Sequence, residues 1–166
     1  MSLIKEAKEK NTDAFDQLMQ TQLQRMYRIA ISMLNNEEDA ADAIQETVLK
    51  CWQKLGQLKN EEYFQTWLTR ILINQCKDII KARKRFVSME EVPEEGYEDD
   101  YFTGEWKRLL QVLDVKYRIV MELYYAEGYS TKEIAEMLHI TDANVRSRMT
   151  RGRKQLEQYI RTNSIA

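Results

Sequence analysis

Apolar residues recur at helical spacing along most of the chain, and this periodicity is the feature that most limits its fold. The pattern runs through the first 85 residues and returns after about residue 105. The 166 residues include one proline and five glycines, which is too few for a loop-rich β fold. The chain is therefore predicted to be all-α. The apolar positions of the first periodic stretch are Phe15, Leu18, Met19, Leu23, Met26, Tyr27, Ala30 and Leu34.

Capping residues divide the first 85 residues into helices. Thr12 is expected to cap the first helix, and Asn36 the second, because Thr and Asn side chains accept bonds from the free N–H groups of a helix start. The second helix is expected to end at about Leu55. A third is expected from about Asn60 to about Arg85.

The segment "VSMEEVPEEGYEDDYFTGE" interrupts the periodicity. It contains the only proline, and residues 86–106 hold eight acidic side chains without any Lys or Arg. We predict an acidic flexible linker over residues 86–105 that joins two small helical domains, 1–85 and 106–166.

Charge is segregated along a chain whose overall net charge is only −2. Residues 70–85 carry a net charge of +5, and residues 139–166 carry +4. The block of −8 lies between them. Such segregation is typical of separate surfaces with separate partners.

The residue inventory excludes several functional classes. Cys51, Cys76 and the single histidine are too few for a four-ligand zinc site of the usual kind, and we expect both thiols to be buried in a reducing cytosol. No apolar run approaches the roughly 20 residues that cross a bilayer, and the start of the chain is too polar for a signal peptide. We therefore expect a cytoplasmic protein without membrane insertion of its own, and no catalytic residue, metal or cofactor.

The stretch "GYSTKEIAEMLHITDANVRSRMTRGRKQLEQYI" predicts a helix-turn-helix. Ser130 and Glu133 have the spacing of a capping box, and Thr141 is expected to cap the second helix after a short turn. His139 lies in that turn and is expected to tolerate a positive φ. One stripe of the second helix is expected to pack inward: Val145, Met149, Gly152, Leu156 and Ile160.

The other side of the second helix of the helix-turn-helix carries small and basic side chains. No acid occurs between Asp142 and Glu157, whereas a solvated helix normally carries Glu four positions from each Arg. We predict that this side enters the major groove of DNA, with central cations at base edges and flanking ones, including Arg153, at phosphates; a merely solvated face is the alternative. The predicted DNA-binding residues are Ala143, Asn144, Arg146, Ser147, Arg148, Thr150, Arg151 and Lys154.

The third helix shows a second basic stripe. Phe64, Leu68, Leu72 and Ile79 are expected to form its core face, and Trp67 borders the stripe, where a core position is favoured over a stacking platform. Cations suit phosphates, and one amide among them suits a base edge. The predicted nucleic-acid-binding residues are Arg70, Asn74, Lys77, Lys81, Arg83, Lys84 and Arg85.

The predicted helix between Asn36 and Leu55 carries acidic residues, and no basic residue balances them before Lys50. An acidic stripe beside an apolar one favours docking on a basic protein helix, with a solvated face as the alternative. The residues of this acidic stripe are Asp39, Asp42, Gln45, Glu46 and Leu49.

With these motifs in this order, the chain resembles the extracytoplasmic-function (ECF) sigma factors of the sigma-70 family. The resemblance rests on "DAADAIQETVLKCW", on the F-x-x-WL-x-x-I-x-x-N pattern at Phe64–Asn74, and on "EIAEML…NVRSRMTRGRKQL". The chain departs from the family pattern at Asp114, His139, Asn144 and Gly152, where Pro, Gly, Thr and Ala are usual. The differences in the second helix of the helix-turn-helix leave the preferred −35 sequence open.

The resemblance implies a function and partners. The acidic stripe would dock on the β′ clamp coiled coil of core RNA polymerase, which is also contacted through its β flap. Asn74 would bind a base flipped from the non-template strand of the −10 element, and the second helix of the helix-turn-helix would bind the −35 element of promoter DNA. The linker would enter the polymerase as a nucleic-acid mimic. The protein would direct promoter opening for a stress-type regulon, and an anti-sigma factor, often membrane-bound in the family, would hold it inactive.

Two other functions are compatible with the residues. A conventional helix-turn-helix repressor or activator would bind a palindromic duplex without polymerase. A protein–protein adaptor without a DNA role would keep its activity after Arg151→Glu.

Overall fold

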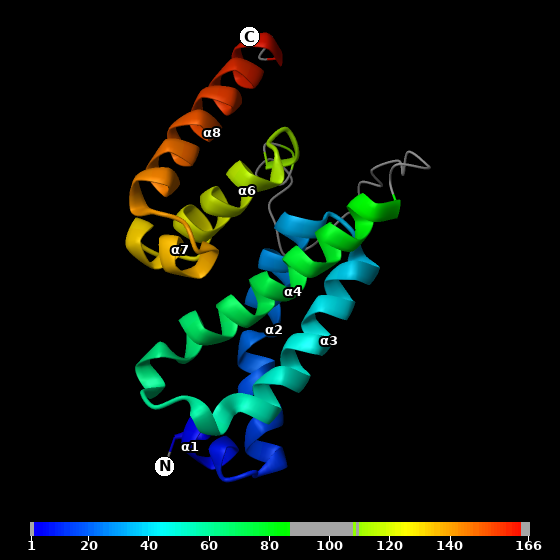
Figure 1. Ribbon diagram of the computed structural model, residues 1–166, viewed down its shortest axis with the longest axis vertical. Coiled ribbons are helices and arrows are strands. Elements are labelled where there is room, and N and C mark those ends of the chain that lie inside the picture. Colours follow the sequence, from blue (N-terminus) through cyan, green and yellow to red (C-terminus); the bar gives the residue numbers. More distant parts are fainter. Residues whose placement is uncertain (1, 87–107, 109, 164–166) are drawn as a thin grey trace. The chain divides into compact units, whose positions relative to one another are not determined.

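The computed structural model describes residues 2–86, 108 and 110–163, and the elements in these ranges are helices (Figure 1). The all-α prediction is confirmed. The chain divides into two compact units, Met1–Glu94 and Glu95–Ala166. The predicted linker and the predicted return of helix at about Glu105 fall almost wholly outside the described residues, so the domain limits 1–85 and 106–166 stay a prediction.

The N-terminal unit is built around three helices that pack against one another, α2, α3 and α4 (Figure 1). The short helix α1, which the sequence did not predict, packs against α2 and η1. Leu68, Leu72 and Ile73 of α4 and Met26 and Ile29 of α2 are fully buried at the centre. The elements are α1 (Leu3–Lys8), α2 (Thr12–Leu34), α3 (Glu37–Lys54), η1 (Leu55–Gln57), η2 (Glu61–Tyr63) and α4 (Phe64–Phe86).

Asparagines set the ends of α2 and α3. Asn11, and not Thr12, caps α2: its side-chain oxygen accepts a hydrogen bond from the N–H of Ala14 at 3.2 Å. Asn35 then adopts a left-handed conformation with φ 48°, which asparagine tolerates better than most residues. Asn36 caps α3 as predicted, at 2.9 Å from the N–H of Asp39. The chain therefore reverses direction between α2 and α3 within two residues.

The buried seam of α2 differs from the predicted apolar positions at two residues, Leu23 and Tyr27, of which Tyr27 is half-buried. Leu23 is 40% exposed, whereas Gln22 is buried. The seam passes through Gln22 at spacings of three and four residues, so Leu23 lies about 100° away from it.

The C-terminal unit contains α6 (Val115–Met121), η3 (Glu122–Ala126), α7 (Thr131–Leu138) and α8 (Asp142–Asn163). The predicted helix-turn-helix is confirmed as α7, a short turn and α8. Both bonds of the capping box form, each at 3.1 Å, between Ser130 and Glu133. The Thr141 hydroxyl accepts from the N–H of Asn144 at 3.0 Å, and His139 has φ 57°.

The seam of α8 is buried at Val145, Met149, Gly152 and Leu156, where the helix packs against α6 and α7. Ile160 is 48% exposed, so the prediction that it packs inward is wrong. The physical reason is length: α8 has 22 residues, but α6 and α7 have 7 and 8, so the last turns of α8 extend beyond them (Figure 1).

Candidate nucleic-acid interface

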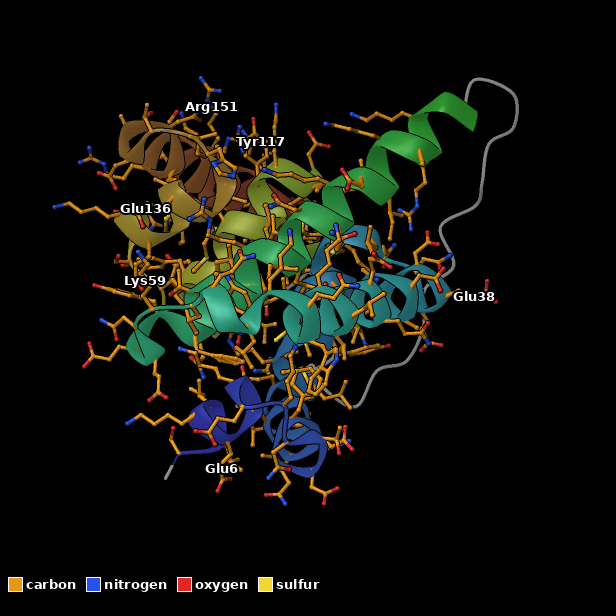
Figure 2. All side chains as sticks on the ribbon, turned by 60° about the horizontal axis from the view of Figure 1, so that its bottom comes forward. Glu6, Glu38, Lys59, Tyr117, Glu136 and Arg151 are labelled. Carbon is orange, nitrogen blue, oxygen red and sulfur yellow. The ribbon has the colours of Figure 1, made fainter. Side chains whose placement is uncertain are left out.

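The outward face of α8 is exposed along its first four turns. Figure 2 shows the Arg151 side chain extending away from the helix. Seven of the eight predicted DNA-binding residues are exposed, and Arg148 is half-buried. The face lies opposite the buried seam because positions 147, 151 and 154 are about half a turn from 145, 149 and 156. The exposed residues are Ala143, Asn144, Arg146, Ser147, Thr150, Arg151 and Lys154.

Local contacts hold several cations of α8. The Arg146 guanidinium pairs with the Asp142 carboxylate at 3.1 Å. Arg148 donates from Nε to the side-chain oxygen of Asn144 at 3.1 Å. Within the described part of the chain, Arg151 forms no ion pair. The face therefore combines oriented cations with a central arginine that is available to a ligand.

An exposed tyrosine that the sequence pattern did not predict lies beside this face. Tyr125, in η3, accepts a hydrogen bond from Nε of Arg153 at 2.8 Å, and the guanidinium lies 5.7 Å from its ring centroid. The Tyr124 ring meets Tyr125 edge-on at 4.9 Å. The "YY" pair could have drawn attention as two aromatics next to a basic helix, but 28 positions separate Tyr125 from Arg153. Only the packing of η3 brings them together.

The stripe on α4 is also exposed for most of its length. Arg70, Asn74, Lys81 and Lys84 are exposed and Lys77 is half-buried, whereas the Arg85 side chain lies outside the described part. The exposed residues of this stripe can reach a polyanion at the same time as the opposite side of α4 packs into the core.

The core face of α4 agrees with the prediction at three of its four residues. Phe64, Leu68 and Leu72 are buried, and Ile79 is half-buried. Trp67 is half-buried too, with its ring centroid 6.2 Å from that of Phe64. The indole therefore meets the core at the buried Phe64 and remains partly exposed.

One cation of α4 is already paired. Arg83 forms an ion pair with Asp39, the first residue of the acidic stripe on α3, and Nε of Arg83 lies 2.8 Å from Oδ2 of Asp39. No basic residue balances the acidic stripe before Lys50 along the sequence, but in the fold Arg83 balances it at Asp39. The physical reason is the packing of α3 against α4, which joins residues 44 positions apart.

The rest of the acidic stripe is exposed and leads into an apolar hollow. Asp42, Gln45 and Glu46 are exposed, and Leu49 is 49% exposed. An open depression of about 350 Å³ adjoins them, which the sequence did not predict. It is lined by Thr12, Phe15, Asp16, Gln45, Val48, Leu49 and Trp52.

Aromatic contacts support the wall of this hollow. The rings of Phe15 and Trp52 meet edge-on at 4.9 Å. Lys10 covers the Trp52 ring at 4.3 Å and donates to its carbonyl oxygen at 2.7 Å. The hollow with its acidic border suits a partner helix that carries both basic and apolar side chains.

The thiols are buried as expected and are not paired with each other. Burial raises the pKa of Cys51 from an ordinary value of 9.0 to about 12. The pKa of Cys76 is also raised to about 12 by burial, although the nearby Arg83 cation acts in the opposite direction. Among the described residues, no cluster of three or more His, Cys, Asp or Glu side chains could hold a metal ion. No helix in the same ranges has the length and apolar character needed to cross a bilayer.

Family models match both units. The model described as "Sigma-70 region 2" matches residues 18–86, and that described as "Sigma-70, region 4" matches residues 103–156. Among the curated relatives, the ECF RNA polymerase sigma factor SigE of Mycolicibacterium smegmatis is 30% identical over 164 residues, which is 91% of this chain and 63% of the relative. SigW of Bacillus subtilis is 29% identical, with 95% of each chain covered.

Solved structures show the same fold. CnrH, in complex with the cytosolic domain of CnrY, has a TM-score of 0.71 and 25% identity, and the match covers 97% of this chain and 96% of CnrH. The sigma factor RpoE from Bartonella quintana, in complex with the anti-sigma factor NepR, has a TM-score of 0.76 and 24% identity over 90% of this chain and 98% of that one.

A two-unit helical chain with a helix-turn-helix, matched by both sigma-70 regions, defines a class of transcription initiation factor. The chain belongs to the ECF sigma factors of the sigma-70 family. Such factors direct promoter-specific transcription and are not enzymes.

Proposed function

We propose that the chain binds core RNA polymerase, recognises the −35 and −10 elements of its promoters and directs their opening. In this proposal the α8 face binds the −35 duplex. The α4 stripe captures the opened non-template strand of the −10 element, where Asn74 binds a base and the cations bind phosphates. The observation that carries the proposal is that α4 and α8 each bury an apolar seam and expose a basic face, on separate units of one chain.

The acidic stripe is the proposed contact with the polymerase. Four of its five residues, Asp42, Gln45, Glu46 and Leu49, are exposed, and the hollow beside Trp52 offers a site for an apolar side chain of the partner. We assign this surface to the β′ clamp coiled coil, because acids beside an apolar hollow complement a basic amphipathic helix. The β flap is the proposed contact of the C-terminal unit.

Regulation is proposed from the same relatives. Two ECF-like structures were solved as complexes with CnrY and NepR, the second of which is an anti-sigma factor. An anti-sigma factor, in the family often anchored in the membrane, is therefore the proposed inhibitor of this chain in the cytoplasm, and a stress-type regulon its proposed target.

Reconstituted transcription tests the proposal. Core polymerase is incubated with the chain and a set of candidate promoters, and the transcript starts are mapped. We expect new start sites that depend on the chain. The proposal fails if the added chain never changes which start sites are used. Tight binding to a palindromic duplex without polymerase would instead favour a conventional repressor or activator.

A further inference from the structure

The ion pair between Asp39 and Arg83 joins two surfaces to which the proposed function gives different partners. Asp39 begins the acidic stripe in the first turn of α3. Arg83 lies near the end of α4, among the cations assigned to the opened DNA strand. Both Nε and Nη2 of Arg83 donate to the same carboxylate oxygen of Asp39.

Both members of this pair can be reached from solvent. The Arg83 side chain is 34% exposed and the Asp39 side chain 31%. A cation of a protein partner can therefore compete for Asp39, and a phosphate can compete for Arg83. In the free chain, the pair neutralises one acid of the docking surface and one cation of the DNA surface.

We propose that this ion pair couples polymerase docking to capture of the opened DNA strand by an exchange of partners. Docking of a basic residue of the polymerase on Asp39 releases Arg83 for a phosphate, and binding of a phosphate by Arg83 releases Asp39. The inference rests on the proposed function and deepens it. Because the pair has to be broken only once for two binding events, each partner raises the affinity for the other by the same factor.

Two gains of affinity follow that a purely structural ion pair would not give. Asp39→Asn frees Arg83 and should strengthen the binding of DNA by the free chain. Arg83→Gln frees Asp39 and should strengthen docking on the polymerase. Each gain should be about two- to fivefold, the range expected when an ion pair that is partly accessible to solvent is broken.

The DNA gain is measured by the anisotropy of a fluorescent single-stranded DNA of mixed sequence, titrated with the free full chain at low salt. Glu38→Gln is the matched control, because it removes the same charge one residue away from Asp39. Glu38 is exposed, lies outside the proposed surfaces and extends outward from the start of α3 (Figure 2). We expect Asp39→Asn to exceed Glu38→Gln by at least about twofold. In the assembled holoenzyme this advantage should vanish, because the polymerase already occupies Asp39.

The docking gain is measured by titrating core polymerase with labelled full-length chain. Lys54→Gln is the control for Arg83→Gln, since Lys54 is exposed on α3 outside the proposed surfaces. Arg83→Gln should dock about two- to fivefold more tightly than wild type, and Lys54→Gln should dock as wild type does. Thermal unfolding of each variant shows whether it is folded, and partial loss of fold would lower both affinities rather than raise them.

The outcomes separate this inference from the proposed function. If the wild-type chain binds core polymerase but neither substitution gives its gain, the exchange is wrong and the proposed function stands. If the wild-type chain does not bind core polymerase at all, the proposed function fails and the exchange fails with it.

Discussion

Helices α4 and α8 both expose a row of cations, but the side chains that hold these cations in place differ between the two helices. Each buries an apolar seam and exposes cations, but α8 holds its cations with neighbours in its own unit, such as Asp142 and Tyr125. On α4, the cation at position 83 is held by Asp39, which belongs to another proposed binding surface. The α8 face is thus suited to act independently of the rest of the chain, whereas the α4 stripe is suited to respond to a partner of α3.

The largest effect is expected in the alkylation rate of the two buried thiols, which tests whether the two units are independent. Cys51 and Cys76 both lie in the N-terminal unit, so alkylation reports on that unit alone. With the pKa raised from 9.0 to about 12, the thiolate fraction at pH 8 falls by a factor of about 1,000. We expect iodoacetamide to react at least that much more slowly with the native chain than with the chain in denaturant.

A variant of the C-terminal unit serves as the control for both thiols. A substitution that unfolds only the C-terminal unit should leave their protection intact. Rapid alkylation of the native chain would show that the N-terminal core opens readily, and it would contradict the burial on which the α4 stripe depends.

Arg151→Ala should give the next largest effect, on the α8 side of the comparison. If α8 binds the −35 duplex as proposed, loss of this central cation should weaken that binding by about 1–3 kcal/mol and lower the salt slope by about one. Holoenzyme binding to a duplex fragment at several salt concentrations measures both. Arg161→Ala is the control, because Arg161 is on the same helix but paired with Glu157 at 2.7 Å. An equal loss of affinity in both variants would show that the α8 face contributes only nonspecific electrostatic attraction to DNA.

Gly152→Ala should stabilise the C-terminal unit. A Cβ at this position would lie 3.5 Å from Met121 and Tyr117, an ordinary packing distance, and alanine gains up to about 1 kcal/mol over glycine within a helix. Thermal unfolding should therefore shift upward without any change in thiol protection. Gly128→Ala should shift it downward, because Gly128 has φ 77°. Destabilisation by Gly152→Ala would show that α6 and α8 are packed too closely for a methyl group.

Tyr125→Phe should have the smallest effect. It removes the hydroxyl that accepts from Arg153 but keeps the ring, so Arg153 should be oriented less well toward DNA. We expect a two- to threefold loss of duplex affinity, which corresponds to about 0.5 kcal/mol for an exposed hydrogen bond. The loss should disappear when Arg153 is already replaced by alanine. Tyr124→Phe is the control. An equal loss of duplex affinity in that variant would contradict a specific role for the Tyr125 hydroxyl.

The sequence predicted what depends on neighbours along the chain. The capping box at Ser130, the cap at Thr141 and the positive φ of His139 follow from local chemistry, and all three are confirmed. The displacement of the α2 cap from Thr12 to Asn11 is a one-residue error between two residues that both cap well. The buried seams were predicted where helices have partners along their length.

What the sequence could not predict depends on packing between distant segments. Nothing near Asp39 in the sequence indicates Arg83, and nothing near Arg153 indicates Tyr125. Ile160 continues the apolar stripe of α8, but its burial depends on how far the shorter α6 and α7 extend beside it. The roles of the basic residues in promoter recognition stay a prediction, because exposure and charge define what a surface can bind without naming the ligand.

The central claim is a division of labour between α8 and α4, and one crossed measurement tests it. Holoenzymes containing Arg151→Ala or Asn74→Ala are titrated with a duplex −35 fragment and with a forked fragment whose −10 non-template strand is single-stranded. Arg151→Ala should weaken binding of the duplex fragment, whereas Asn74→Ala should leave that fragment unaffected and weaken only the added contribution of the open strand. Equal losses for the two variants on both fragments would contradict the account.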